Sequence, residues 1–304
     1  MSYWYHIYGL DVHSEIELPE LAAIERRPQI HTDVTIRSGV CPLSAAECQM
    51  PRTLVRYREN EAAFYFPRYG VFVVRAGREI VYEPQPPTEV AELRPFLLGI
   101  VMGILLIQRG FSVLHGSTVA INNCGVTFVG YKGAGKSTTV AGLVQRGGLL
   151  VADDVTAITE RNDQYVLQPA SPQIRLWPDS VQQLGYQVTT LSRVHPTFLK
   201  RNWPPTLEQT EQQVVPLRRI YVLEDGDEPA IVPLDAENTF IELMRHMYLS
   251  RWPRVAKQQQ AQFFQAAALS NQVPVFKLRR PKNFDALPHV LDLLEAAHAN
   301  VTCD

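Results

Sequence analysis

The first part of the chain alternates apolar and polar residues in short runs, which are separated by Gly, Pro and polar turns. A period of two residues is typical of half-buried β-strands. The pattern predicts strands at 4–8, 34–37, 54–57, 63–66, 71–75 and 80–82. The runs end at a proline-rich segment, 83–88, which has the composition of a linker. Residues 1–88 are therefore predicted to form a small β-rich accessory domain. It carries no catalytic constellation, and we expect it to recruit the substrate.

After residue 88 the pattern changes to that of an α/β domain, which is expected to fill residues 89–304. The apolar run 95–107 predicts a buried helix, because it is too short to span a bilayer, and no membrane insertion is expected. Further strands are predicted at 111–114, 117–121, 125–129, 149–152, 155–159, 165–168, 219–223 and 273–278, and helices at 138–146, 235–248, 261–269 and 288–297. Residues 186–213 have weak periodicity and form either a segment that covers the substrate or a long connection.

The loop that follows the strand at 125–129 carries the most specific motif of the chain. It has the phosphate-binding pattern G-x-x-x-x-G-K-[ST], and its residues are Gly130, Tyr131, Lys132, Gly133, Ala134, Gly135, Lys136, Ser137 and Thr138. The glycines let backbone N–H groups turn toward phosphates, Lys136 reaches the terminal phosphate oxygens, and the Ser137 hydroxyl is a ligand for Mg²⁺. Since a strand precedes the loop and a helix follows it, the motif predicts binding of a nucleoside triphosphate.

Two carboxylates, Asp153 and Asp154, come directly after the next predicted strand. An acidic pair is usually a solvated turn, but this pair lies where an open α/β sheet presents its chemistry, beyond the carboxyl end of a strand. Phosphoryl transfer needs both a metal ligand and a group that accepts a proton. One Asp is therefore predicted to help hold Mg²⁺ and the other to accept the proton of a substrate hydroxyl.

The composition of the chain excludes several classes of protein. The 304 residues, 46% of them hydrophobic, suffice for one large or two modest domains with a good core. A net charge of −2 provides no basic surface for nucleic acid or for an anionic membrane. Cys41, Cys48, Cys124 and Cys303 are scattered and indicate neither a zinc site nor a disulfide framework. With no secretory signal at the N-terminus, a reducing, cytoplasmic location is expected.

Several of these segments share their residues and their order with a known family. They are Leu114-His115-Gly116-Ser117, the phosphate loop with its helix, and the run from residue 149 to Val155. Over 111–158 the chain resembles the HPr kinase/phosphorylase family. More narrowly, it is similar to the stand-alone HPr-kinase-like serine kinases of bacterial gene clusters, including those that modify lasso-peptide precursors. The resemblance implies an α/β fold, with a P-loop kinase core of the HPr kinase/PEP carboxykinase type and a small β-rich N-terminal domain.

The resemblance also implies roles for single residues. Asp153 matches the general base of the HPr kinases and Asp154 its metal-associated neighbour, so that Ser137 and Asp154 would hold the metal. His115, which alone would read as a structural histidine, matches a histidine of the catalytic site. The family's Glu-Val-Arg-Gly-type signature is replaced here by the segment around Arg175. The resemblance therefore does not extend to the reverse, phosphate-removing reaction or to the protein HPr as substrate.

Charge on the transferred phosphoryl group calls for a second cation beside Lys136. Each candidate can also be read as an ordinary surface or packing charge, and the candidates are Arg175, Arg251 and Arg254, with Lys200 and Arg201 behind them.

The sequence thus predicts an ATP- and Mg²⁺-dependent kinase whose acceptor is a serine or threonine hydroxyl of a peptide or protein. Two alternatives stay open. One is a kinase for a small molecule, such as a free hydroxy amino acid, and the other is a nucleotide-dependent regulatory or scaffold protein with slow ATPase activity. The absence of an Asn-Lys-x-Asp guanine-reading motif favours adenine. No nucleic-acid partner is expected, and the resemblance leaves a homo-oligomer open.

Overall fold

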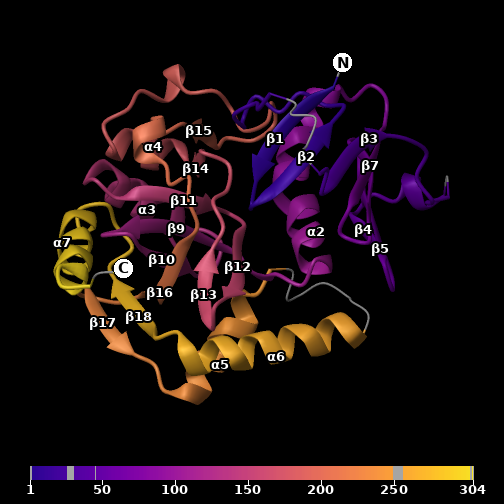
Figure 1. Ribbon diagram of the computed structural model, residues 1–304. Helices are drawn as coiled ribbons and strands as arrows, with labels where there is room; N and C mark the ends of the chain where they lie inside the picture. Colours follow the sequence, from indigo (N-terminus) through magenta and orange to yellow (C-terminus); the bar gives the residue numbers. More distant parts are fainter. Residues whose placement is uncertain (1, 26–30, 45, 249–255, 302, 304) are drawn as a thin grey trace. The chain divides into compact units, whose positions relative to one another are not determined.

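The structure is a computed structural model that describes residues 2–25, 31–44, 46–248, 256–301 and 303 (Figure 1). Its residue contacts divide the chain into two compact units. Unit 1 consists of Met1–Phe111 and Arg251–Ala261, and unit 2 of Ser112–Ser250 and Gln262–Asp304. The division falls after Phe111 rather than near residue 88, because the apolar helix that follows the proline-rich segment packs on the sheet of unit 1.

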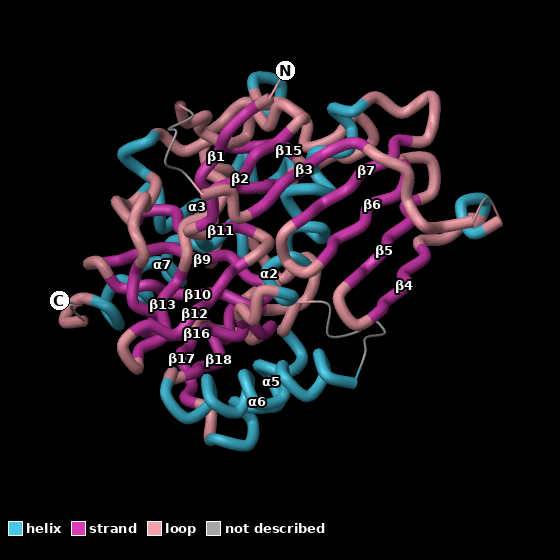
Figure 2. Tube along the Cα trace, turned by 45° about the vertical axis from the view of Figure 1, so that its right-hand side comes forward, coloured by secondary structure: helices cyan, strands magenta, loops and turns pink. Residues whose placement is uncertain are grey.

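Unit 1 contains a seven-stranded sheet with the strand order β1-β2-β3-β7-β6-β5-β4 (Figure 2). Each of the six strands predicted for this region is present, and a further strand, β2, forms a hairpin with β1. The strands are β1 (Tyr3–Ile7), β2 (Leu10–Ser14), β3 (Val34–Ser38), β4 (Leu54–Arg58), β5 (Glu61–Phe66), β6 (Gly70–Arg75) and β7 (Glu79–Pro84). Alternate residues of β5 and β6 face opposite sides of the sheet, as a period of two requires.

The apolar helix of unit 1 is longer than its sequence pattern predicts. It runs from Val90 to Gln108 as η2 (Val90–Leu93), α1 (Arg94–Phe96), η3 (Leu97–Val101) and α2 (Met102–Gln108). Phe96 packs against Phe66 of β5, with ring centroids 4.7 Å apart, and lies 6.3 Å from Phe72 of β6. By length and composition alone this helix could cross a membrane, but 56% of its apolar window is buried within the structure, as in the core helix of a folded domain.

Unit 2 is an α/β unit with a nine-stranded mixed sheet (Figure 1). The main path of the sheet is β11-β9-β10-β16-β13-β12-β8, and β18 and β17 extend it from β16. The strands are β8 (Ser112–Leu114), β9 (Gly116–Ile121), β10 (Cys124–Val129), β11 (Leu149–Asp153), β12 (Thr156–Arg161), β13 (Gln164–Leu167), β16 (Val215–Asp225), β17 (Ala230–Pro233) and β18 (Val275–Arg280). The helices are α3 (Lys136–Gln145), α4 (Pro178–Gln183), α5 (Ala236–His246), α6 (Ala256–Gln272) and α7 (Leu287–His298).

Alternation along the strands explains why helices cover both faces of this sheet. Val126 and Phe128 of β10 belong to a core cluster with α3 and α7, whereas Val129 belongs to a second cluster with α5 and α6. In β16, Tyr221 belongs to the first of these clusters and its neighbour Ile220 to the second. The predicted α/β architecture, with a phosphate-loop core and a β-rich N-terminal unit, is confirmed.

Residues 186–213, for which the sequence left two interpretations open, contain regular structure. Strand β15 (Arg201–Trp203) pairs antiparallel with β14 (Ile174–Leu176), and two short turns of 3₁₀-helix, η4 (Val188–Thr190) and η5 (Leu207–Gln209), flank it. The strands are too short to produce a readable alternation. This segment brings Lys200 to the site described below.

The cysteine prediction is wrong in one respect. Cys124, at the start of β10, and Cys303, after α7, form a disulfide although 179 residues separate them in sequence. Spacing along the chain could not reveal this pair, because the sheet and α7 bring the two residues together only in the fold. The expectation of a reducing compartment, which rested partly on the absence of a disulfide framework, loses that support.

One buried histidine gives unit 2 a predicted pH dependence. His298, fully buried at the end of α7, shares a hydrogen bond of 3.1 Å between its Nε2 and the Tyr221 hydroxyl. Burial, assisted by the charge of Arg219, lowers the pKa of His298 to about 4. Between pH 6.5 and pH 4 the unfolded chain therefore binds the proton more readily than the folded chain does, and stability falls as the pH falls. We expect a loss of about 2 kcal/mol from pH 7 to pH 5.

Urea denaturation of the wild type and of His298→Gln at pH 7 and pH 5 measures this contribution. The variant should lose about 2 kcal/mol less than the wild type over the same interval. An equal loss in both proteins would show that other groups cause the acid sensitivity.

Candidate active site

Three neighbouring strands of unit 2 bring the site together. Strand β9 lies between β10 and β11 and is antiparallel to both, so the carboxyl ends of β10 and β11 meet the amino end of β9 at one edge of the sheet. Ser117 of β9 pairs with Phe128 on one side and with Asp153 on the other. The phosphate loop, the two aspartates and His115, which precedes β9, therefore lie together as the sequence analysis expected.

The phosphate loop has the backbone that its glycines allow. Gly133 and Gly135 have φ values of 82° and 88°, in the left-handed region that side-chain-bearing residues rarely adopt. Helix α3 begins at Lys136, directly after Gly135. The loop therefore presents the N–H groups of a helix N-terminus, the arrangement that binds phosphate.

Lys136 is the most buried charge of the loop, with 8% of its surface exposed. Its Nζ donates to the carbonyl oxygens of Gly130, at 2.8 Å, and Tyr131, at 3.4 Å. Burial lowers the pKa of Lys136, and the carboxylates of Asp153 and Asp154 act in the opposite direction. The ammonium group is thus held inside the loop by acceptors that a phosphate oxygen can supplement or replace.

The carboxylate of Asp153 accepts three hydrogen bonds. Oδ1 accepts hydrogen bonds from the Ser117 hydroxyl at 2.5 Å and from the Ser137 hydroxyl at 2.8 Å. Oδ2 accepts one from the backbone N–H of Arg175 at 2.8 Å. The carboxylate that contacts the expected metal ligand Ser137 is therefore that of Asp153, whereas the sequence analysis paired Ser137 with Asp154.

Asp154 has a different environment. Its backbone is left-handed, with φ of 74°, which directs the chain sharply away from β11. Its Oδ1 lies 3.2 Å from Nδ1 of His115, and its Oδ2 lies 3.4 Å from a terminal nitrogen of Arg175. Burial raises the pKa of Asp154, but the contact with His115 and the charges of Arg175 and Lys200 outweigh it and lower the pKa well below its usual range. Asp154 is therefore a carboxylate at physiological pH.

Two of the expected cations face these carboxylates. Arg175 contacts both aspartates, and Lys200, which precedes β15, lines the same cavity of about 70 Å³ together with Lys132, Lys136 and His115. The Nζ of Lys200 also lies 5.8 Å from the centre of the Trp177 ring. The candidates Arg251 and Arg254 lie outside the described residues. Among the described cations, Lys200 and Arg175 are placed to assist Lys136.

The donor set fits Mg²⁺. The Ser137 hydroxyl and the Asp153 carboxylate, 2.8 Å apart, are hard oxygen ligands of the kind that Mg²⁺ takes beside water and substrate phosphates. In the part of the chain that the structure describes, no group of three or more His, Cys, Asp and Glu residues could hold a metal by itself. A magnesium site here would therefore depend on the nucleotide for its remaining ligands.

Sequence reasoning missed two contributors to the site. Ser117 was noted only as part of a motif, and its contact with Asp153 depends on the register of β9 against β11. Arg280, at the end of β18, donates from a terminal nitrogen to the carbonyl oxygen of Ala134 in the loop. More than 140 residues separate Arg280 from the loop, and no local pattern marks it.

Comparison with known proteins gives a partial match that covers this site. Residues 110–176 match the family model described as the HPr Serine kinase C-terminal domain. The chain is 40% identical over 151 residues to an HPr kinase/phosphorylase of Lactobacillus acidophilus, covering 50% of this chain and 40% of that protein. It is 46% identical over 61 residues to one from Alkaliphilus metalliredigens, covering 20% of this chain and 19% of that protein. The alignments thus span less than half the length of these relatives.

Among solved structures, the HPr(Ser) kinase/phosphatase from Coxiella burnetii superposes with a TM-score of 0.34 at 15% identity, over 62% of this chain and 96% of that one. A superposition at that score supports no conclusion. The sequence matches are the evidence for the relationship, and the family-model match at 110–176 includes the strands, loop and aspartates described above. The phosphate-loop core of this chain is therefore related to the C-terminal domain of the HPr kinase/phosphorylase family.

Proposed function

We propose that this protein is a kinase that transfers the γ-phosphoryl group of ATP, with Mg²⁺, to a serine or threonine hydroxyl of a peptide or protein. The observation that carries the proposal is the pair of adjacent carboxylates with separate partners, Asp153 with Ser137 of the phosphate loop and Asp154 with His115. Phosphoryl transfer requires these two functions, one at the metal and one at the attacking hydroxyl.

The loop would bind the triphosphate through its backbone N–H groups and Lys136. Ser137 and Asp153 would hold Mg²⁺, which supplies neutralising charge at the β- and γ-phosphates. Lys200 and Arg175 would add positive charge at the side of the cavity that faces Asp154. Most of the rate enhancement in such a site comes from positioning and electrostatics, because the transition state is loose.

Asp154 is the proposed proton acceptor. As the acceptor oxygen forms its bond to the γ-phosphorus, the hydroxyl proton passes to the Asp154 carboxylate and ADP leaves. Asp153 is less suited to this step, because it would hold the metal beside Ser137 and its three hydrogen bonds, at 2.5 to 2.8 Å, are shorter than the contacts of Asp154 at 3.2 and 3.4 Å. In a loose transition state the group that accepts the hydroxyl proton need not be a strong base. The lowered pKa of Asp154 is therefore compatible with the role of proton acceptor. His115 would orient this carboxylate.

A peptide acceptor is the finer part of the proposal. A precursor peptide of the lasso type is one substrate that the resemblance of the core suggests. The recruitment of this acceptor by unit 1 and a cytoplasmic location both stay predictions from the sequence.

A substrate screen tests the proposal. The purified protein is incubated with ATP and Mg²⁺ and with pools of serine-containing peptides and free hydroxy amino acids, and the products are analysed by mass spectrometry. We expect an increase of one phosphate on a peptide serine or threonine and none without Mg²⁺. Phosphorylation of free amino acids alone would identify a small-molecule kinase. ATP hydrolysis without any phosphorylated product would favour a regulatory ATPase.

A further inference from the structure

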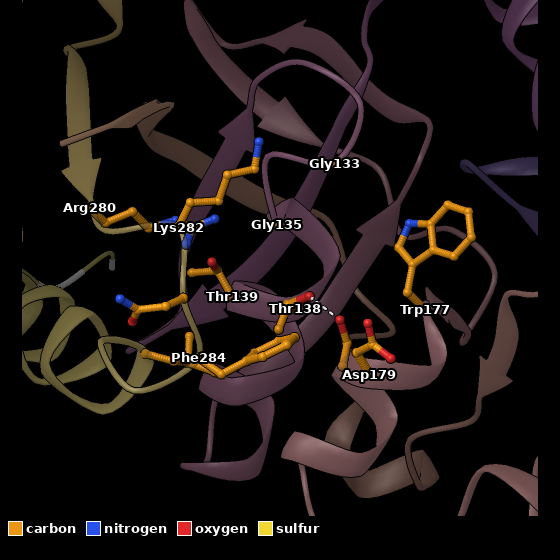
Figure 3. A pocket seen from close by; sticks show the side chains of 12 residues that line it. Gly133, Gly135, Thr138, Thr139, Trp177, Asp179, Arg280, Lys282 and Phe284 are labelled. Carbon is orange, nitrogen blue, oxygen red and sulfur yellow. Dashed lines mark hydrogen bonds between the residues drawn. The ribbon is translucent and has the colours of Figure 1, made fainter.

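A second cavity adjoins the catalytic one at the phosphate loop (Figure 3). Its volume is about 310 Å³, compared with about 70 Å³ for the catalytic cavity, and the two share Gly133, Gly135, Thr138 and Trp177. A volume of this size is within the range of small-molecule sites. Apart from the loop and the start of α3, all of its lining lies beyond residue 176, where the family match ends.

The two cavities differ in chemistry. Asp153, Asp154 and His115 line only the catalytic cavity, and the charged residues of the second one, Asp179, Arg280 and Lys282, do not line the first. The ring of Phe284 lines only the second cavity, whereas the Trp177 ring lines both, and Figure 3 shows the two rings on opposite sides of Thr138. A nucleotide is divided in the same way, since its phosphates are anionic and its base is flat and largely apolar.

We propose that the second cavity binds the base and ribose of the nucleotide and that Phe284 is the surface on which the base stacks. This inference deepens the proposed kinase function and rests on it. A ligand whose phosphates lie in the loop must place its nucleoside at a neighbouring site, and the second cavity shares two glycines of that loop. Stacking on an aromatic ring is a common way of binding a base.

The segment that carries Phe284 is fixed to the loop and to α7. Arg280 donates to the Ala134 carbonyl oxygen, and a Cβ at Gly135 would collide with its guanidinium group. The Asn283 side chain accepts a hydrogen bond from the Ala286 N–H at 2.9 Å, which closes a turn that contains Phe284. These contacts fix the backbone that carries Phe284 beside the loop.

The opposite wall is fixed as well. The hydroxyls of Thr138 in α3 and Ser180 in α4 share a hydrogen bond of 2.9 Å, drawn as the dashed line in Figure 3. Both walls are therefore bonded to the phosphate loop or to its helix. An acceptor peptide is a poorer occupant, because its hydroxyl must reach Asp154, which lines only the catalytic cavity.

Calorimetric titration of two ligands tests the assignment. ADP contains the nucleoside, whereas tripolyphosphate contains only the phosphates, and both are titrated in the presence of Mg²⁺. In Phe284→Ala we expect the Kd for ADP to rise about ten- to a hundredfold, the value of one stacked base. The Kd for tripolyphosphate should stay within about twofold, and Phe284→Tyr should restore ADP binding. Phe264→Ala, which removes an exposed phenylalanine of α6, is the matched control and should bind both ligands normally.

Other results would overturn the inference. Equal weakening of ADP and tripolyphosphate would mean that Phe284 acts through the loop rather than on the base. Unchanged ADP binding with a raised KM for the acceptor would make the cavity an acceptor site. If the wild-type protein bound neither ligand, the nucleotide-dependent function itself would be wrong, which is a different result from a specific failure of Phe284.

Discussion

Replacing Lys136 with alanine should lower kcat/KM for ATP by about 10²–10³-fold, the usual effect of removing one preorganised charge from a transition state. The variant should fold normally. The wild-type ammonium is nearly buried, donates to two backbone carbonyls of its own loop and interacts with Asp153 and Asp154 through their charge, so its removal breaks no direct ion pair among the described residues. Steady-state kinetics with circular dichroism of both proteins measures the effect.

Lys132→Ala is the comparison for this variant. Lys132 lies in the same loop and lines the same cavity, but its side chain is exposed to solvent. A flexible, hydrated ammonium contributes less than one held in place, so we expect a loss of about tenfold or less. Wild-type turnover by a folded Lys136→Ala protein would refute the phosphate-loop assignment.

Changing Asp153 or Asp154 to asparagine should impair the activity in two different ways. Asp154→Asn keeps the shape but removes the proposed proton acceptor, so kcat should fall about 10²–10⁴-fold even at saturating Mg²⁺. Asparagine tolerates the left-handed backbone of this position, which protects the local structure. Asp153→Asn should instead raise the Mg²⁺ concentration needed for half-maximal activity, because it weakens the ligand beside Ser137.

Magnesium titrations of kcat distinguish these outcomes, and Ser137→Ala serves as the control for the metal side. If Ser137 and Asp153 hold the same ion, Ser137→Ala should shift the Mg²⁺ dependence in the same direction as Asp153→Asn. A loss of kcat in Asp153→Asn that Mg²⁺ cannot restore, together with a shifted Mg²⁺ dependence in Asp154→Asn, would return the roles to the assignment implied by the family resemblance. Thermal unfolding checks that Asp153→Asn remains folded after losing one of its hydrogen-bond acceptors.

Much of the site could be predicted because it is local in sequence. The phosphate loop and the aspartates lie within 25 residues, and a strand-loop-helix-strand pattern places them at one edge of a sheet without any knowledge of the remaining chain. The division of roles between Asp153 and Asp154 could not be predicted in this way. It depends on the backbone turn at Asp154 and on the register that sets Ser117 opposite Asp153.

The residues that distant parts of the chain contribute to the site could not be predicted from the local sequence pattern either. Arg280 ends β18 and Phe284 follows it, and the sequence of this strand has no distinguishing feature. Only the parallel pairing of β18 with β16, which in turn pairs with β10, brings the two residues to the loop. The position of the division between the units, after Phe111, has a related reason. The proline-rich segment looks like a boundary, yet the helix after it covers the phenylalanines of β5 and β6.

The bond between Cys124 and Cys303 makes a covalent ring of the intervening chain. The ring begins with the strand that leads into the phosphate loop and ends after α7, so it encloses the loop, both aspartates, Lys200 and Phe284. One peptide-bond cleavage inside the ring opens it but leaves Asp153 and Asp154 covalently joined to the phosphate loop and to Phe284. A cleavage before residue 124 instead separates the chain into two molecules. As long as the disulfide is intact, the phosphate loop, both aspartates, Lys200 and Phe284 therefore belong to one closed covalent ring, whereas His115 and Ser117 precede it.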